Sequence, residues 1–206
     1  MKLFKNNQSG RSMIEMLGVL AIIGVLSIGG IAGYSKAMFK YKMNKTLDIV
    51  NNSIHRLIEL ENSNIGDITI SGAQNMLDYG IVSDCDTTYG ESTCAIPLGY
   101  INYYLVFRDF NLDGSIAYVF TQHQYESCVA FLNSKFYKTI PDEWFNPSKD
   151  CDVCERYDYI DIVGEESSES FSTTSNLTTD DVINMCQVCK NTTGYCYLEM
   201  SFRPQG

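Results

Sequence analysis

Two pairs of cysteines share the spacing of metal-binding and redox motifs. Cys151 and Cys154 are separated by two residues, and so are Cys186 and Cys189. Four thiolates at such spacings are typical ligands of a structural zinc ion in a reducing compartment. In an exported protein the same cysteines are expected to form disulfides. The compartment in which the chain resides therefore decides which chemistry these side chains perform.

An N-terminal segment of membrane length indicates export, so we expect disulfides in place of zinc. The chain has eight cysteines in 206 residues. The disulfide candidates are Cys85, Cys94, Cys128, Cys151, Cys154, Cys186, Cys189 and Cys196. Eight cysteines allow on the order of 100 connectivities, so the sequence leaves the pairing open. The simplest local pairing joins Cys85 to Cys94, and Cys128 is expected to pair with a cysteine near the C-terminus.

One segment begins like a calcium-binding loop. Asp109, Asn111 and Asp113 alternate with other residues, and Gly114 follows them. This is the opening of an EF-hand loop, but Phe120 stands where the bidentate glutamate is needed. An Asp-Gly turn between two strands explains the same residues. We therefore expect a hairpin turn here and keep calcium as an open alternative, with no other cofactor expected.

No catalytic arrangement is evident. The chain has only two histidines, His55 and His123, and neither lies beside a nucleophile motif. Glycine-rich phosphate loops are also missing from the sequence. We therefore do not expect an enzyme.

The most informative charged residue is Glu15, at the start of an apolar run. Residues 13–34 contain Glu15 as their only formal charge. About 20 such residues suffice to cross a membrane as a helix, whereas the apolar region of a secretory signal peptide is shorter. A lone carboxylate in such a segment is costly in lipid and is by default functional. Gly29 and Gly33 add a small-xxx-small spacing that lets helices approach closely.

The residues around Glu15 resemble the N-terminus of a type IV prepilin. Gly10 ends a short leader that carries Lys2 and Lys5, and Glu15 follows five residues later, ahead of the apolar run. The resemblance implies that a prepilin peptidase cuts between Gly10 and Arg11 and that Arg11 is then N-methylated. The family usually has phenylalanine or another apolar residue at that position. The resemblance also implies that Glu15 neutralises the terminal amine of a neighbouring subunit during assembly.

The same resemblance implies the partners and the location of the chain. The partners are the prepilin peptidase, an assembly platform with its ATPase, and copies of this chain or other pilins. The chain would first cross the bacterial inner membrane once, with the leader in the cytoplasm and the head in the periplasm. It would then enter a surface pilus or a periplasmic pseudopilus.

Charge is distributed unevenly along the chain. Residues 1–45 hold seven basic residues and one acid, whereas residues 46–206 hold eight basic residues and 24 acids. An acidic C-terminal part argues against binding nucleic acid through a basic surface. Four of the basic residues, Lys36, Lys40, Lys42 and Lys45, directly follow the apolar run.

The remaining pattern predicts an α+β fold, with a long N-terminal helix packed on a C-terminal antiparallel sheet. After the leader, residues 1–10, we expect an apolar helix over 11–34 and its amphipathic continuation over 35–62. The continuation follows from apolar residues at helical spacing, namely Leu47, Val50, Ile54, Leu57 and Ile58. Residues 63–206 would form the disulfide-rich acidic head.

Within the head, local composition predicts short helices and strands. Helices are expected over 71–79 and 124–136, and strands over 101–110, 116–121, 156–163 and 195–202. The segment 164–181 is polar and rich in serine, threonine and glutamate, so we expect an exposed loop there.

Together these features favour a structural subunit of a type IV pilus or a related filament. Two alternatives stay open. One is a minor pilin or pseudopilin of a type II-like secretion or DNA-uptake system. The other is a membrane-anchored, cysteine-rich binding protein that does not polymerise.

Overall fold

The computed structural model describes residues 11–63, 67–83, 85–87, 90–91, 93–108, 111–141, 159–173, 175–190 and 192–202. The chain divides into two units, residues 1–41 and 42–206. Helix α1 (Arg11–Asn62) runs through both. The elements that follow α1 are β1 (Ile68–Ser71), α2 (Gly72–Asp78), β2 (Thr93–Ile96), β3 (Gly99–Arg108), β4 (Asn111–Phe120), α3 (Gln124–Asn133), η1 (Phe136–Thr139), β5 (Tyr159–Val163), β6 (Ser168–Ser172), α4 (Thr179–Met185), η3 (Cys186–Cys189) and β7 (Cys196–Phe202).

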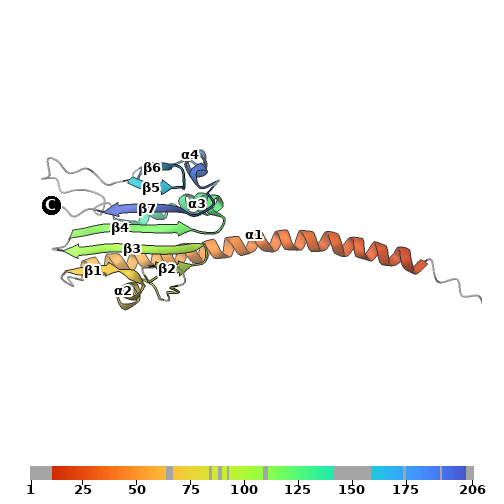
Figure 1. Cartoon of the computed structure of the whole chain (residues 1–206), viewed down its shortest axis with the longest axis horizontal. Helices are drawn as coiled ribbons and strands as arrows, with labels where there is room; N and C mark the ends of the chain where they lie inside the picture. The colour runs from red at the N-terminus through yellow and green to blue at the C-terminus, as the bar shows by residue number, and fades with distance from the viewer. Residues whose placement is uncertain are drawn as a thin grey trace, which may run out of the picture. The chain divides into compact units, whose positions relative to one another are not determined.

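The strands of the described residues form one antiparallel sheet of seven strands (Figure 1). The order is β1-β3-β4-β7-β5-β6, and β2 pairs with β3 next to β1. Strand β2 pairs with residues 99–102 of β3, and β1 pairs with residues 104–107. Two short strands therefore share one edge of β3. The last strand, β7, lies between β4 and β5, in the interior of the sheet.

One face of the sheet is apolar and buried. Pairing places Ile101 opposite Tyr118, and Tyr118 opposite Leu198. All three side chains are buried, as are their neighbours two residues along each strand. On the opposite face Tyr104 keeps 56% of its surface exposed. The sheet thus has the one-sided burial typical of antiparallel sheets.

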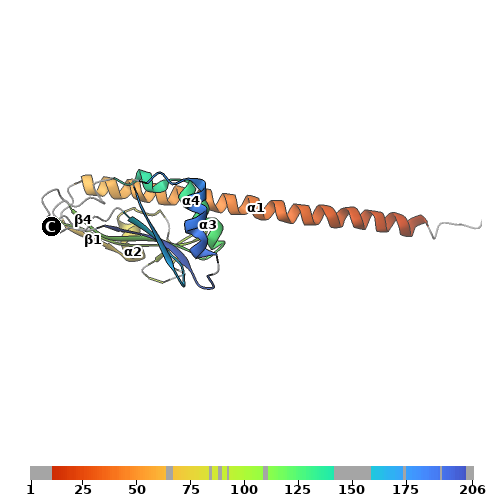
Figure 2. The same ribbon diagram turned by 90° about the horizontal axis from the view of Figure 1, so that it is seen from above.

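The C-terminal part of α1 covers this apolar face, as seen from above in Figure 2. Its buried residues recur every three or four positions and are Met43, Thr46, Val50, Ser53, Ile54, Leu57 and Leu60. The predicted stripe is therefore correct at Val50, Ile54 and Leu57, whereas Leu47 and Ile58 are only half-buried.

A second group of side chains covers the β4 and β7 part of the same face. The Phe131 ring of α3 lies 5.1 Å from Tyr118 and 4.2 Å from Phe136 of η1, measured between ring centroids. Tyr137 in turn lies 5.3 Å from Phe171 of β6. These aromatic contacts join α3, η1 and the edge strand β6 to one core.

The α+β class, the antiparallel sheet and the long N-terminal helix are confirmed. The helix expected over 71–79 is α2, with Ser71 as its N-cap, Tyr79 as its C-cap and Gly80 beyond it at a φ of 66°. The helix expected over 124–136 ends at Asn133, and a 3-10 turn begins at Phe136.

The predicted β-hairpin is confirmed, but the predicted position of its turn is wrong. Residues 111–114 belong to strand β4, and the pairing of Arg108 with Asn111 leaves only residues 109–110 as the connection. Gly114 pairs with Leu105 at a φ of 127°, and a Cβ there would lie 1.8 Å from the Tyr104 carbonyl oxygen. Glycine is thus required by a close approach between strands, and not by a turn.

The expectation of an exposed loop over 164–181 is also wrong. This segment contains β6 and the start of α4, although most of its side chains are exposed. Phe171 alone anchors β6 in the core. Helix α4 begins at a capping box in which Asp181 accepts from the Thr178 backbone amide and Thr178 accepts from the Asp181 amide. Threonine followed three residues later by aspartate is a recognised start signal for helices that our interpretation overlooked.

A buried hydroxyl pair joins α1 to the sheet. Ser53 Oγ donates to the Val50 carbonyl and lies 2.5 Å from the hydroxyl of Tyr103 on β3. Burial raises the pKa of Tyr103 to about 12, although its bond to Ser53 acts in the opposite direction. Burial also raises the pKa of Tyr118, beside Tyr103. The neutral phenols are therefore part of the folded state.

Because the Tyr103 phenol is neutral in the folded state, we expect the protein to lose stability at alkaline pH, and we expect Tyr103→Phe to reduce that loss. An unfolded tyrosine titrates near pH 10, so the stability that neutral Tyr103 contributes is complete below about pH 10 and is lost between about pH 10 and 12. Tyr103→Phe should cost about 1 kcal/mol at pH 8 through its lost hydrogen bond. The deficit should shrink as the pH rises to 12 in urea denaturation followed by circular dichroism.

The matched control is Tyr104→Phe, on the exposed face of the same strand. It should leave the free energy of unfolding at pH 8 unchanged. A constant difference between wild type and Tyr103→Phe from pH 8 to 12 would contradict the assignment.

Candidate functional site: an exposed apolar helix with one carboxylate

The first part of α1 exposes apolar side chains on all sides. Between 52% and 75% of each large apolar side chain remains exposed across this stretch. These residues are Met13, Ile14, Met16, Leu17, Val19, Leu20, Ile22, Ile23, Val25, Leu26, Ile28 and Ile31. Within the described residues, α1 is the one helix that is both long enough and apolar enough to cross a membrane, judged by length and composition alone.

Glu15 is the only charged residue among them, and its side chain is exposed. No described side chain forms a hydrogen bond or an ion pair with its carboxylate. By contrast, the hydroxyl of Ser27 donates to the Ile23 carbonyl at 2.7 Å, so it is satisfied within the helix. If this stretch is buried in lipid or against other helices, Glu15 is the charged group that has to be neutralised there.

Most glycines of α1 lie on the same face as Glu15. At about 100° per residue, Gly18, Gly29, Gly30 and Gly33 lie within about 60° of Glu15 around the helix axis, whereas Gly24 lies on the opposite face. A Cβ built at any of these glycines meets nothing within 4 Å. These glycines do not serve packing within the described chain. Gly18 lies about one turn from Glu15 and leaves room there for another helix, whereas Gly29 and Gly33 lie about 21 and 27 Å further along and allow a close approach at that level.

The other sequence-predicted processing residues are described only in part. Gly10 lies outside the described residues. Arg11 is the first residue of α1, and its side chain is not described. Of the calcium candidates, Asp109 lies outside the described residues, whereas Asn111 and Asp113 lie in β4, opposite Arg108 and Val106. The strand geometry places those two residues on a ladder and not in a loop.

Three disulfides link the described cysteines. They join Cys85 to Cys94, Cys128 to Cys186 and Cys189 to Cys196. The first agrees with the simplest local pairing, and the second joins the middle helix to the C-terminal region as expected. Because Cys186 and Cys189 both belong to disulfides, neither offers a thiolate to zinc. Cys151 and Cys154 lie outside the described residues.

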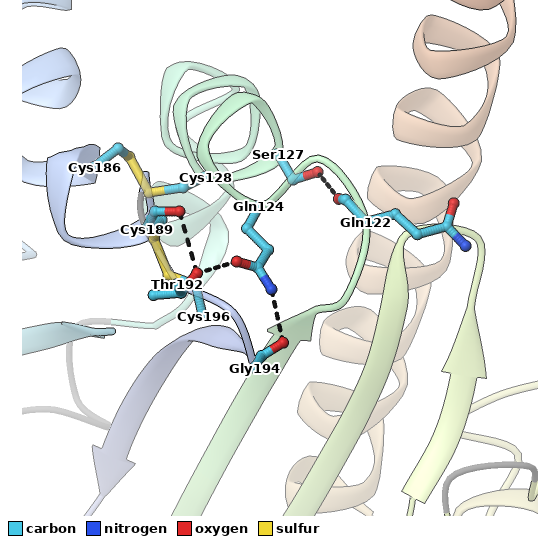
Figure 3. Close-up of a disulfide and its surroundings, with 9 residues drawn as sticks. All are labelled: Gln122, Gln124, Ser127, Cys128, Cys186, Cys189, Thr192, Gly194 and Cys196. Carbon is cyan, nitrogen blue, oxygen red and sulfur yellow. Dashed lines mark hydrogen bonds between the residues drawn. A yellow bond between two sulfur atoms is a disulfide. The ribbon is translucent and has the colours of Figure 1, made fainter. Parts of the chain in front are cut away.

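Two of these disulfides meet at one end of the sheet, in a region that we call the disulfide corner: Cys128, Cys186, Cys189 and Cys196 (Figure 3). All four are buried. The amide of Gln124 at the start of α3 donates to the Gly194 carbonyl at 2.8 Å, and the Thr192 hydroxyl donates to the side-chain carbonyl of Gln124. The connection from η3 to β7 is thus attached to α3 by both covalent and hydrogen bonds.

The disulfide corner also connects to α1. Ser127 Oγ donates to the Gln122 carbonyl at 3.0 Å, and Lys42 of α1 donates to the Gln122 side chain at 2.9 Å. Helix α3 and the C-terminal part of α1 are therefore joined through one residue. Sequence spacing did not predict this contact, because it joins residues 80 positions apart.

The described structure is thus a mixed α+β protein with a disulfide-bonded antiparallel sheet and an apolar N-terminal helix. Comparison of the chain with known protein families, with curated proteins and with solved structures found no match.

The loss of stability on removing a disulfide should increase with the length of chain that the disulfide closes. Chain-entropy estimates give about 4 kcal/mol for the Cys128–Cys186 bridge and about 2 kcal/mol for Cys189–Cys196. Their sequence separations are 58 and 7 residues. Cys128→Ser/Cys186→Ser should therefore lower the free energy of unfolding by about twice as much as Cys189→Ser/Cys196→Ser. Urea denaturation at pH 7 measures both, and the reverse order would contradict this account.

Proposed function

We propose that this chain is a structural subunit of a type IV pilus or a related pilin-like filament. In this proposal it is made as a prepilin, is cut between Gly10 and Arg11, and assembles through α1. The observation that carries the proposal is Glu15, a single carboxylate on an apolar helix exposed on all sides. Its position five residues after Gly10 supports the resemblance to prepilins.

The physical reason for assembly is mutual neutralisation. Cleavage creates a terminal ammonium at Arg11, four residues before Glu15. A buried charge is tolerated when an opposite charge accompanies it, whereas either charge alone is strongly unfavourable. If the ammonium of one copy lies against Glu15 of the next, both apolar helices can be buried together. The lack of a side chain at Gly18, one turn from Glu15, supports such close approach.

The remaining features agree with the proposed role as a filament subunit. The disulfides favour an oxidising location, as expected for a periplasmic head before assembly and for a surface filament or pseudopilus afterwards. The partners would be the prepilin peptidase, the assembly platform with its ATPase, and copies of this chain or other pilins. The role is structural and not enzymatic.

Processing can be tested by mass. Co-expression with a prepilin peptidase should remove Met1 to Gly10, and intact mass spectrometry should find a chain that begins at Arg11. Gly10→Val should block this cleavage, because a branched side chain replaces the glycine at the cut. Gly18→Ala is the matched control, since open space surrounds that glycine, and it should be cut normally. A wild-type chain left intact by an active peptidase would refute the prepilin assignment.

Assembly depends on Glu15 in this proposal. Glu15→Gln should leave cleavage intact but reduce incorporation into filaments more than about 100-fold, because an unpaired ammonium would have to be buried. Glu59→Gln is the control on the same helix, since its exposed ion pair with Arg56 contributes little. Quantitative immunoblotting of sheared filaments measures incorporation. Wild-type incorporation of Glu15→Gln would rule out the role assigned to the carboxylate.

A further inference from the structure

The residues at the end of the apolar stretch have a different chemistry from those before it. Tyr34 and Tyr41 keep 65% and 63% of their surfaces exposed. Lys36 and Lys40, which lie between them, are exposed too. We call these four residues the interfacial band. All of them belong to the unit formed by residues 1–41.

The lysines of the band carry charge that the described chain does not neutralise. The ion pair found among the described residues joins Arg56 to Glu59, and it involves neither lysine. Lys36 and Lys40 are four residues apart, so they lie on the same helix face and repel each other slightly. Lys42 differs, since it donates to Gln122. The two band lysines are thus available to an anionic ligand.

The spacing of the band matches the layers of a bilayer. Residues 13–33 span about 31 Å at 1.5 Å per residue, close to the roughly 30 Å thickness of a hydrocarbon core. Tyr34 to Tyr41 then extend about 10 Å, slightly more than the roughly 5 to 8 Å that one head-group layer occupies. Tyrosine and lysine are the side chains that typically occupy that layer.

The arrangement around the helix favours a lipid surface over a protein partner. Tyr34 and Tyr41 are seven residues apart and share one face, whereas Lys36 and Lys40 lie roughly on the opposite face. The band therefore surrounds α1. A docked protein covers one side of a helix, but a lipid layer contacts it on every side at one depth.

We propose that Tyr34, Lys36, Lys40 and Tyr41 form a lipid-binding band in which the two lysines select anionic phospholipid head groups and the two tyrosines anchor at the interface. The proposal requires that the apolar stretch enters a bilayer. It does not require that the chain is processed or polymerises. The lipid-binding proposal can therefore fail while the proposed filament function holds, and the filament function can fail while lipid binding holds. Its consequence is an electrostatic contact that must be broken when the chain leaves the membrane.

The test compares head groups on the full-length chain in neutral detergent micelles. Dioctanoyl phosphatidylglycerol and dioctanoyl phosphatidylcholine are titrated in turn, and native mass spectrometry gives each dissociation constant. Each lysine near an anionic surface is expected to contribute about fivefold. The wild-type chain should therefore prefer phosphatidylglycerol by about 25-fold, and Lys36→Gln/Lys40→Gln should abolish this preference.

The matched control removes the same charge elsewhere. Lys135→Gln/Lys190→Gln replaces two exposed lysines of the head, lowers the net charge equally and should leave the preference unchanged. Lys36→Arg/Lys40→Arg should retain the preference for phosphatidylglycerol, and added salt should weaken that preference. Soluble glycerol phosphate should not compete at the lipid concentrations used, because it lacks the acyl chains that the tyrosines help to anchor.

Several results would overturn the proposal. One is equal affinity of the wild-type chain for the two lipids, and another is a preference that survives Lys36→Gln/Lys40→Gln. If Lys135→Gln/Lys190→Gln lost the lipid preference to the same extent, the preference would depend on net charge and not on a site. Competition by glycerol phosphate would identify a simple phosphate site. Self-association that depends on Lys36 and Lys40, with no lipid preference, would assign the band to the acidic head of another copy.

Discussion

An apolar side chain left in water costs free energy in proportion to its exposed area, and helix α1 meets this constraint differently along its length. From Met43 to Leu60 its apolar residues are buried against one face of the sheet. From Met13 to Ile31 they have no cover among the described residues. The stretch from Met13 to Ile31 has no apolar environment within the described chain. In our proposal a bilayer supplies that environment first, and other copies of α1 supply it after assembly.

The head is built around the buried stretch of α1. One apolar sheet face needs a cover, and a single helix is too narrow for seven strands. Aromatic residues of α3 and η1 complete the cover over β4 and β7. The disulfide corner fixes α3 to the C-terminal elements, and Lys42 and Gln122 connect it to α1. In our proposal, these covalent bonds stabilise the head of a filament subunit outside the cytoplasm.

Local patterns in the sequence predicted much of this fold. The periodic positions Val50, Ile54 and Leu57 identified the buried face of α1, and local composition identified β3, β4 and β7. The order of the strands could not be predicted, because the insertion of β7 between β4 and β5 depends on pairing between distant residues. The turn was misplaced because Gly114 has the composition signal of a turn but meets a steric requirement within a strand.

The functional residues differ in how far the sequence could define them. Glu15 and its apolar surroundings were evident, since a lone charge in such a segment is conspicuous. The position of Gly18 on the same face as Glu15, one turn away, became evident only from the geometry of the helix. The pairing of Cys128 with Cys186 required the fold, because spacing alone permits many alternatives. Zinc was set aside on grounds of location, and the disulfides of Cys186 and Cys189 now give a structural reason.

The central claim is that the ammonium of Arg11 and the carboxylate of Glu15 meet between neighbouring copies. Solid-state NMR on filaments can measure this contact directly, if ¹⁵N-arginine-labelled and ¹³C-glutamate-labelled subunits are mixed before assembly. The account predicts a dipolar coupling between the terminal nitrogen and Glu15 Cδ that corresponds to about 5 Å or less, as an ion pair imposes. Assembled filaments that lack this coupling would contradict it.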